Sequence, residues 1–324
     1  MPTRQPLPGI SSKAWEHPAD RAALNTLRAL PGFDEVLRKV MSYLGERGVR
    51  QIFLANAVRV GPTQRPKLDA LYTDVLASLD WPTRHELYVS QNPIANAAAI
   101  GFGKPFIIIN SGMLEILTEE EQRDVLAHEL GHVMSGHPTY TTLAQLLILV
   151  GTHGLPFLAG LALLPIQLAL LEWYRKAEFS ADRAALLSTQ EPNTTMSVFL
   201  KLAGGPGLGD RIDLDAFMAQ ASEYEEQTGL VDNVWKVLNT AFRTHPMATV
   251  RAAELQRWIR AGDYDRVLRG EYPRRGGEDD RPLREDYADA AGYYGQNFKD
   301  VAASVNASVN RAKDAFNQAF KPKR

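Results

Sequence analysis

The stretch DVLAHELGHVMSGH contains two histidines four positions apart, with a glutamate directly after the first. Residues four apart on an α-helix lie on one face, so the imidazoles of His128 and His132 can reach one tetrahedral metal ion. Glu129 lies beside the first imidazole, where a general base can take a proton from a water activated at the metal. The spacing predicts a hydrolytic metal site, although the same pattern also occurs in helices that bind no metal.

A hydrolytic zinc site needs a third protein ligand and an open coordination position. The chain has no cysteine, so the third ligand must be His, Asp or Glu. The stretch RKAEFSADR places Glu178 and Asp182 on one helical face. We expect Glu178 to be the third ligand, and Asp182 to accept the Nδ1 proton of His128 and so fix its tautomer. The alternative is that both acids are solvated and paired with Arg175 or Arg183.

Three motifs in this order, HELGH, EFSAD and THPMATVR, resemble those of the HtpX-like and CAAX-endoprotease type of zinc metallopeptidase. This is family forty-eight of the metallopeptidases, and the resemblance covers residues 56–255. It implies one Zn²⁺ per chain and hydrolysis of peptide bonds. The residues that it assigns to the ion, to the catalytic base and to the partner of the first histidine are His128, His132, Glu178, Glu129 and Asp182.

The resemblance also identifies NAAAIG as the family's edge strand, in which the backbone of Asn96, Ala97 and Ala98 pairs with an extended substrate. In THPMATVR it places His245 and Arg251 near the active site. His245 would stabilise the oxyanion or cap the zinc in a resting state, and Arg251 would brace the metal-binding helices. A histidine before proline is also a common helix-start residue, which is the structural alternative for His245.

The elements that must position these residues are mostly helical. Apolar spacing predicts helices in 17–30, 33–48 and 65–80, and β-branched, turn-rich sequence predicts strands near 86–90, 96–101 and 105–110. A capping box of Thr118 and Glu121 begins the HELGH helix. Further helices are predicted in EWYRKAEFSADRAALLS and FRTHPMATVRAAELQRWIRAG. We therefore expect an α+β, predominantly α fold, a minimal gluzincin-type domain with a small β-sheet and an amphipathic C-terminal helix.

Composition shifts predict four segments. The catalytic domain is preceded by a helical segment that packs on it and is followed by a charged linker and an amphipathic helical tail. The tail ends in RAKDAFNQAFKPKR, which contains five basic residues and one acidic residue. The predicted limits of the four segments are 1–55, 56–270, 271–286 and 287–324.

The segment 138–171 contains no Asp, Glu, Lys or Arg. HtpX-type relatives carry transmembrane helices here, but two crossings would need about 40 apolar residues and a turn. Residues that interrupt the run are Gly151, Gly154, Pro156, Gly160 and Pro165. A buried lid over the site is favoured because these breaks leave each half below spanning length, and a re-entrant hairpin or an oligomer contact are alternatives. With the basic tail, the segment also suggests peripheral contact with a membrane surface.

The overall composition narrows the function further. A formal net charge of −2 provides no field that would favour nucleic acid, so no such partner is expected. The N-terminus has no apolar run of signal-peptide length, which predicts a cytoplasmic protein. A peripheral location on the cytoplasmic membrane face is the alternative. We predict a zinc-dependent metalloendopeptidase that cuts extended or unfolded polypeptides in protein quality control.

Two other functions fit parts of the sequence. A chaperone-like or membrane-surface binding protein could keep zinc as a structural element, but Glu129 would then have little reason to stand beside His128. A CAAX-type endoprotease needs a large membrane chamber, and the chain lacks the transmembrane helices to build one.

Overall fold

The computed structural model describes residues 4–28, 32–153, 157–206, 213–226 and 248–276. The predicted tail, residues 277–286 of the predicted linker, and His245 lie outside these ranges. The predicted limits of the four segments stay predictions. In chain order the helices and strands are α1 (Pro18–Arg28), α2 (Phe33–Leu54), β1 (Ala57–Arg59), α3 (Pro66–Ser78), β2 (Glu86–Ser90), β3 (Ala97–Ile100), β4 (Phe106–Asn110), α4 (Ser111–Ile116), α5 (Glu119–Met134), α6 (Pro138–His153), α7 (Phe157–Thr189), α8 (Pro192–Gly204), α9 (Leu214–Glu226), α11 (Ala248–Arg260) and α12 (Asp263–Leu268).

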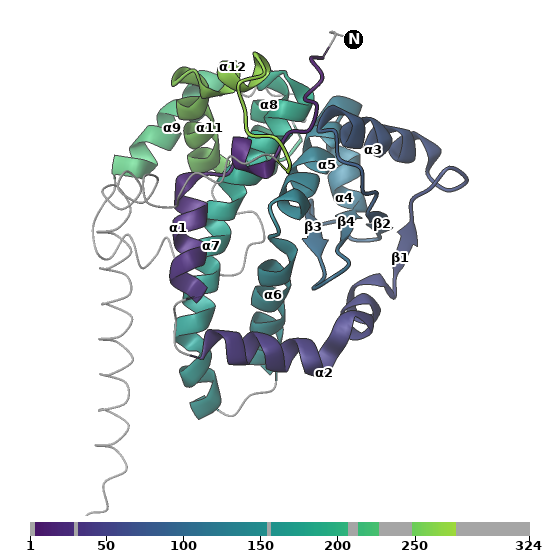
Figure 1. Cartoon of the computed structure of the whole chain (residues 1–324), viewed down its shortest axis with the longest axis vertical. Coiled ribbons are helices and arrows are strands. Elements are labelled where there is room, and N and C mark those ends of the chain that lie inside the picture. The colour runs from purple at the N-terminus through teal and green to yellow at the C-terminus, as the bar shows by residue number, and fades with distance from the viewer. Residues whose placement is uncertain (1–3, 29–31, 154–156, 207–212, 227–247, 277–324) are drawn as a thin grey trace, which may run out of the picture.

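The described residues form a mostly helical α+β fold with one small mixed sheet, as predicted (Figure 1). The strand order is β1-β2-β4-β3, with β2 and β4 parallel and the other two pairs antiparallel. All three predicted strands are present, and the short strand β1 is an addition. Strand β3 lies at one edge of the sheet and pairs with β4 in a register that opposes Ala98 to Ile108.

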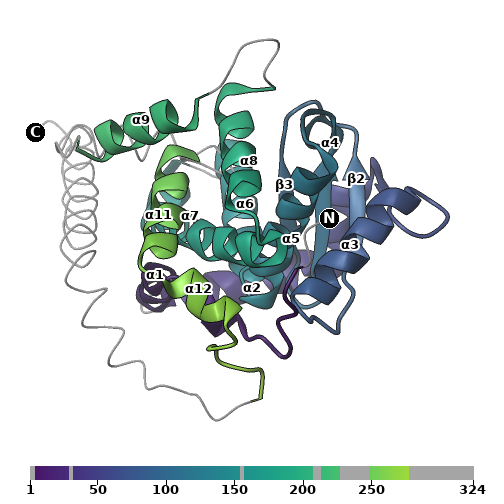
Figure 2. The ribbon, with the colours of Figure 1, turned by 90° about the horizontal axis from the view of Figure 1, so that it is seen from above.

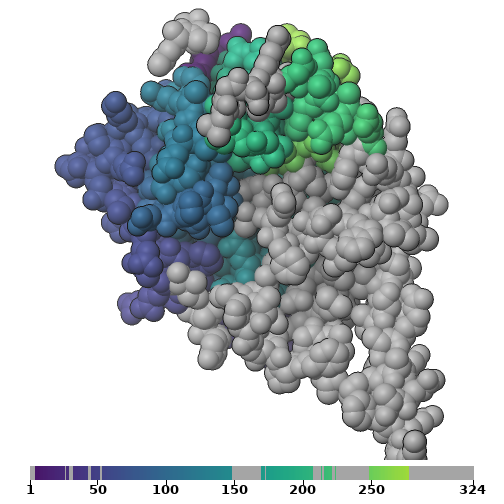
Figure 3. Space-filling model, turned by 180° about the vertical axis from the view of Figure 1, so that it is seen from behind, coloured from purple at the N-terminus to yellow at the C-terminus, as the bar shows by residue number. Residues whose placement is uncertain are grey.

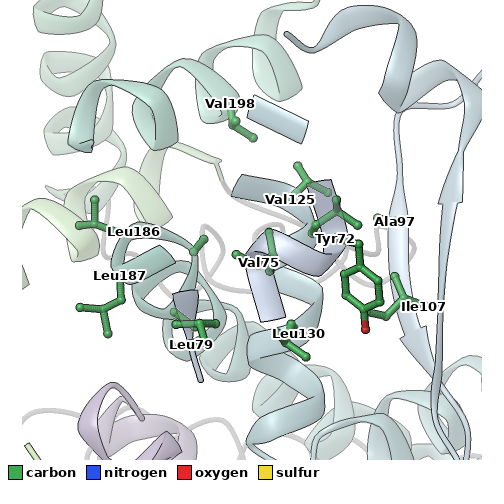
Figure 4. Packing of buried hydrophobic residues seen from close by; sticks show 14 of the residues in the cluster. Tyr72, Val75, Leu79, Ala97, Ile107, Val125, Leu130, Leu186, Leu187 and Val198 are labelled. Carbon is green, nitrogen blue, oxygen red and sulfur yellow. The ribbon is translucent and has the colours of Figure 1, made fainter. Parts of the chain in front are cut away.

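The main apolar core lies between the sheet and the helices α3 and α5. Tyr72 of α3 and Ile107 of β4 are fully buried in it, and Leu130 of α5 joins them (Figure 4). Strand β4 has three consecutive isoleucines, and β-branched residues pack well on a pleated surface. Burial of one face of α5 against this core fixes the orientation of the helix that carries HELGH.

Helices α6 and α7 correct the expectation for the apolar segment. Gly151 lies within α6, and α7 runs without a break through Gly160 and Pro165 and on into EFSAD. The part of the segment nearest HELGH is buried, as the favoured interpretation expected: Leu143 and Leu147 of α6 pack in a cluster with residues of α1 and α2. The prediction that Gly151, Gly160 and Pro165 interrupt the run is therefore wrong, because packing against neighbouring helices can stabilise a helix that propensity alone would end. Within the described ranges, no helix is both long enough and apolar enough to cross a membrane.

Helices from distant parts of the chain pack around α7. Helix α1 lies along α7, and α2 passes across the hairpin end of the molecule (Figure 1). Helix α8 contacts both α5 and α11, which lie on opposite sides of it when seen from above (Figure 2). From behind, the blue residues of the sheet region lie beside the green residues of α8 and α9 (Figure 3). Helix α7 is thus the element against which α1, α5 and α11 meet.

Candidate metal centre

The HELGH helix begins at the predicted capping box. The backbone N–H of Thr118 donates to Glu121 Oε2 at 2.7 Å, and Glu121 N–H donates to Thr118 Oγ1 at 3.4 Å. Three acidic residues occupy the first turn, where they favour the positive end of the helix dipole. This arrangement fixes where the helix starts, and hence which face His128 and His132 occupy two turns later.

A close approach of α5 to α7 brings the two motifs together. Gly131 of HELGH lies directly under α7, where a Cβ would stand 2.6 Å from Ala184 Cβ and 3.4 Å from Ala181 Cα. Small residues on both helices allow the backbones to come closer than larger side chains would permit. As a result, the imidazoles of α5 lie against the acidic face of α7.

The three predicted ligands converge on one point. Nε2 of His128 lies 3.1 Å from Nε2 of His132, and these atoms lie 3.6 and 3.2 Å from the carboxylate oxygens of Glu178. The side chains of all three are buried, and their ligand atoms all lie within 4.8 Å of one another. Two imidazole nitrogens and a carboxylate oxygen that face each other in a buried space form a donor set that fits a metal ion.

The tautomer of His128 is set by its outer nitrogen. Nδ1 lies 3.0 Å from Asp182 Oδ1, so this nitrogen carries the proton and donates it, which leaves the lone pair of Nε2 directed at the cluster. Arg251 holds Asp182 in turn, with Nε at 2.8 Å from Oδ2 and Nη2 at 2.5 Å from Oδ1. Arg251 Nη1 also lies 3.1 Å from Glu178 Oε2. One guanidinium therefore orients both acids of EFSAD.

The charges of this group are coupled. Burial alone would raise the pKa of Asp182, but Arg251 and His128 hold it below its ordinary value. The pKa of Arg251 is raised, because the two carboxylates outweigh the effect of burial. Burial lowers the pKa of His132 to about 3, with the neighbouring His128 acting in the same direction. A neutral imidazole is the form that binds a metal ion.

Glu129 and Tyr174 line the same buried region. Glu129 is only 1% exposed and follows His128 directly on α5. The Tyr174 ring stacks on His132, with centroids 6.4 Å apart and an interplanar angle of 7°. Burial and the charges of Glu178 and Glu129 raise the pKa of Tyr174 well above its ordinary value, so its hydroxyl stays protonated.

The sequence did not indicate the partner of the second histidine. Nδ1 of His132 lies 2.8 Å from Nδ1 of His137, the last residue of DVLAHELGHVMSGH. Nε2 of His137 lies 3.0 Å from Oδ2 of Asp20, which belongs to α1. Trp173 and Ser180 of α7 also donate to Asp20, at 2.9 and 2.6 Å. A histidine five residues after the motif was a usable signal for His137, but an acid on an amphipathic helix carries no such signal.

A second buried acid lies one turn before His128. Thr195 Oγ1 donates to Asp124 Oδ1 at 2.5 Å. Burial raises the pKa of Asp124 to about 7, and the charge of Asp182 adds to this effect while the Thr195 hydrogen bond opposes it. Sequence patterns did not distinguish this acid from a surface residue.

The predicted substrate strand lies beside the HELGH helix. Ala97 and Ala98 belong to β3 and are buried, at 2% and 5% exposure, while Asn96 precedes the strand and its carbonyl accepts from Asn110 N–H at 2.9 Å. Strand β3 packs against α5 and α6 and lies at the edge of the sheet. The structure brings the predicted ligands His128, His132 and Glu178 together with Asp182 and Arg251. The substrate-pairing role of β3 stays a prediction, and His245 lies outside the described residues.

A mostly helical fold with a small sheet, and a buried His–His–Glu cluster with a glutamate beside the first histidine, define a metal-dependent peptidase. The chain belongs to peptidase family M48, because the model of that family matches residues 62–259. The prediction of an HtpX-like family member and of a metalloprotease is therefore confirmed.

Curated relatives agree with this assignment. The chain is 34% identical to plastoglobule-localized metallopeptidase 48, chloroplastic, of Arabidopsis thaliana, over 80% of this chain and 76% of that protein. It is 27% identical to a protease HtpX homolog of Moorella thermoacetica, over 69% of this chain and 82% of that protein. A protease HtpX homolog of Campylobacter concisus is also 27% identical, over 53% of this chain and 67% of that protein. No solved structure matches the chain.

Proposed function

We propose that this chain is a zinc endopeptidase in which His128, His132 and Glu178 hold the ion and Glu129 is the general base. The observation that carries the proposal is the convergence of the three ligand atoms in a buried cluster on α5 and α7. The chain has no cysteine, and two imidazoles with one carboxylate are the ligand set of many hydrolytic zinc sites. When bound, zinc supplies a Lewis acid that polarises the scissile carbonyl and acidifies a water molecule.

The surrounding residues have separate tasks in this proposal. Glu129 takes a proton at its carboxylate from the attacking water and passes it to the leaving amine. Asp182 keeps Nε2 of His128 deprotonated by accepting from Nδ1, and Arg251 holds Asp182 and Glu178 in place. For His245 we retain the prediction that it stabilises the oxyanion or caps the ion at rest.

We propose extended or unfolded polypeptide as the substrate. A strand at the edge of a sheet can pair with an added strand through main-chain groups, and β3 is the edge strand that packs beside α5. Recognition through the backbone accepts many sequences, which suits an enzyme that removes unfolded proteins in quality control. Substrates that carry an N-methyl group on one amide near the scissile bond test this mode. We expect KM to rise at positions that pair with β3, because the methyl group removes a hydrogen-bond donor.

Location and assembly stay predictions. The sequence predicts a cytoplasmic protein, with peripheral membrane contact through 138–171 and 287–324 and with self-association as an option. In the described part of the apolar segment, Leu143, Leu146 and Leu147 are buried, so they are not available for lipid. Flotation of the full chain with anionic and neutral vesicles measures the lipid contact, and sedimentation measures self-association.

The first experiment compares zinc content and casein cleavage for the wild type and Glu129→Gln. We expect both proteins to hold one zinc and only the wild type to cut at internal bonds, as read by mass spectrometry of the products. Glu115→Gln, which changes an exposed glutamate of α4, is the matched control and should cut like the wild type. A wild type without zinc would overturn the proposed site, and cleavage by Glu129→Gln would overturn the role of the base.

A further inference from the structure

Asp20 reaches the metal centre from the N-terminal helix α1. Its carboxylate is 2% exposed, and Oδ2 lies 3.0 Å from Nε2 of His137, which is also 2% exposed. Nδ1 of His137 faces Nδ1 of His132 at 2.8 Å. A continuous chain of two short contacts therefore connects Asp20 with the outer nitrogen of His132.

The positions of the protons along this chain follow from metal binding at His132. Nε2 of His132 must carry a lone pair to bind an ion, so the proton of this ring resides on Nδ1. That proton is donated to Nδ1 of His137, which therefore accepts, and the proton of His137 resides on Nε2 and is donated to Asp20. A doubly protonated His137 would place a proton on Nε2 of His132 instead, so metal binding selects the neutral ring.

We propose that Asp20 and His137 are positioning residues for the second ligand and fix His132 in its metal-binding tautomer through a two-step hydrogen-bond relay. The inference rests on the proposed zinc site. Asp20 would act on His132, through His137, as Asp182 acts on His128: each acid fixes the tautomer of one histidine. Asp182 belongs to α7, whereas Asp20 belongs to α1. Asp20 precedes residues 62–259, which match the family, so the N-terminal helix contributes to the metal centre from outside that span.

Three hydrogen-bond donors converge on Asp20, and only an ionised carboxylate can accept from all of them. Trp173 Nε1–H donates to Oδ1, while Ser180 Oγ–H and His137 Nε2–H both donate to Oδ2. Ser180 Oγ in turn accepts from the backbone N–H of His17 at 2.9 Å, so its own proton is available for Asp20. Burial alone would raise the pKa of Asp20, but the hydrogen bonds from His137, Ser180 and Trp173 act in the opposite direction, and the pKa lies below its ordinary value.

An asparagine at position 20 cannot serve all three donors. If its NH₂ group takes the place of Oδ1, that group opposes the N–H of Trp173. If the NH₂ group takes the place of Oδ2, Nε2 of His137 must accept, and the ring proton moves to Nδ1. His137 then donates to Nδ1 of His132, and the proton of His132 is forced to Nε2, where the metal binds. Asp20→Asn thus either loses the Trp173 hydrogen bond that holds the acid in place or reverses the relay, and it preserves the size of the side chain.

The test measures zinc affinity by competition with a chromogenic chelator, for the wild type, Asp20→Asn and His137→Phe. The phenylalanine keeps a ring against Trp173 but cannot accept from His132. We expect about a 10- to 100-fold loss of zinc affinity in each variant, the range for outer partners of metal-binding histidines. In the double variant the two losses should not multiply, because both interrupt one chain. The kcat for casein should fall while KM stays unchanged.

A cobalt spectrum and a matched variant separate positioning from mere support of the fold. With Co²⁺ in the site, the visible bands should shift in Asp20→Asn and His137→Phe, because the coordination of His132 changes. Glu254→Gln is the control. Glu254 lies 3.5 Å from Nε2 of the buried His17, so it holds the same N-terminal segment as Asp20 does, but it is not a member of the relay. It should lower thermal stability and leave zinc affinity and the cobalt bands as in the wild type.

The outcomes are distinguishable. If the wild type binds zinc and both relay variants bind it equally tightly, the relay is wrong and the proposed function stands. If Glu254→Gln loses as much affinity as Asp20→Asn, the effect is one of general stability and the relay is again wrong. If Asp20→Asn does not fold, the affinity and the cobalt bands of His137→Phe decide alone. If the wild type binds no zinc, the proposed function fails together with the relay.

Discussion

Gly131 of α5 faces Ala184 of α7 with no space for a side chain, since a Cβ at position 131 would stand 2.6 Å from Ala184 Cβ. Gly131→Ala should therefore push the two helices apart. We expect a loss of about 1–3 kcal/mol in the free energy of unfolding, which is typical of overpacking, and weaker zinc binding because the ligands are divided between these helices. Urea denaturation and chelator competition measure the two effects.

A compensating change makes this prediction specific. Ala184→Gly removes the opposing Cβ, so the double variant should recover zinc affinity relative to Gly131→Ala. Gly204→Ala is the control, because nothing lies within 4 Å of a Cβ built there. Failure of the double variant to recover zinc affinity would show that helix separation is not the cause.

Arg251 should support both the fold and the metal site. Arg251→Met leaves the buried carboxylates of Asp182 and Glu178 without their guanidinium, and breaking a buried ion pair of this kind costs about 3–5 kcal/mol. Arg251→Lys keeps the charge but cannot form the forked contact, so an intermediate loss is expected. Urea denaturation measures stability. Arg257→Met on the same helix is the control. The Arg257 side chain is 45% exposed and pairs with Glu254, so its loss should lower the free energy of unfolding by at most about 1 kcal/mol.

Asp124 should make the stability of the metal-free protein depend on pH. Because burial raises its pKa to about 7, the folded protein holds this proton more tightly than the unfolded chain does. The stability that the group contributes is complete below about pH 4 and is lost as the pH rises through about 7. Asp124→Asn keeps an acceptor for Thr195 but cannot ionise. The difference in free energy of unfolding between Asp124→Asn and the wild type should therefore grow in favour of the variant by on the order of 2–4 kcal/mol from about pH 5 to about pH 8.

Urea denaturation with excess chelator at both pH values measures this difference. Asp215→Asn, at an exposed position of α9, is the matched control for an aspartate-to-asparagine change. An equal effect of Asp124→Asn at both pH values would mean that the carboxyl is already ionised in the folded protein at the lower pH.

Zinc should stabilise the protein only where the ligands are intact. At about 1,000 times the dissociation constant, a ligand that binds only the folded state adds about 4 kcal/mol. We expect the full rise in melting temperature for the wild type and for Glu129→Gln, since Glu129 is proposed as a base rather than a ligand. His132→Ala and Glu178→Ala should lose most of it. A full response from either ligand variant would remove that residue from the proposed site.

Local sequence was sufficient for the elements that depend on neighbours along the chain. The capping box of Thr118 and Glu121, the three predicted strands and the break between α1 and α2 are all present. Spacing also placed His128 and His132 on one face, because four residues make about one turn. Family resemblance then indicated Glu178, Asp182 and Arg251, which the structure brings together.

What only the tertiary structure decided depends on packing between distant segments. The unbroken course of α7 through Gly160 and Pro165 contradicts local propensity, and the buried contacts of the hairpin with α1 and α2 supply the stabilisation that propensity lacks. Asp20 lies 117 positions before His137, and no pattern of spacing connects them. Periodicity describes one helix at a time, whereas the partner of an imidazole is set by which helices pack together. The sequence therefore indicated the candidate ligands of the metal centre, and the fold determined which side chains contact those candidates.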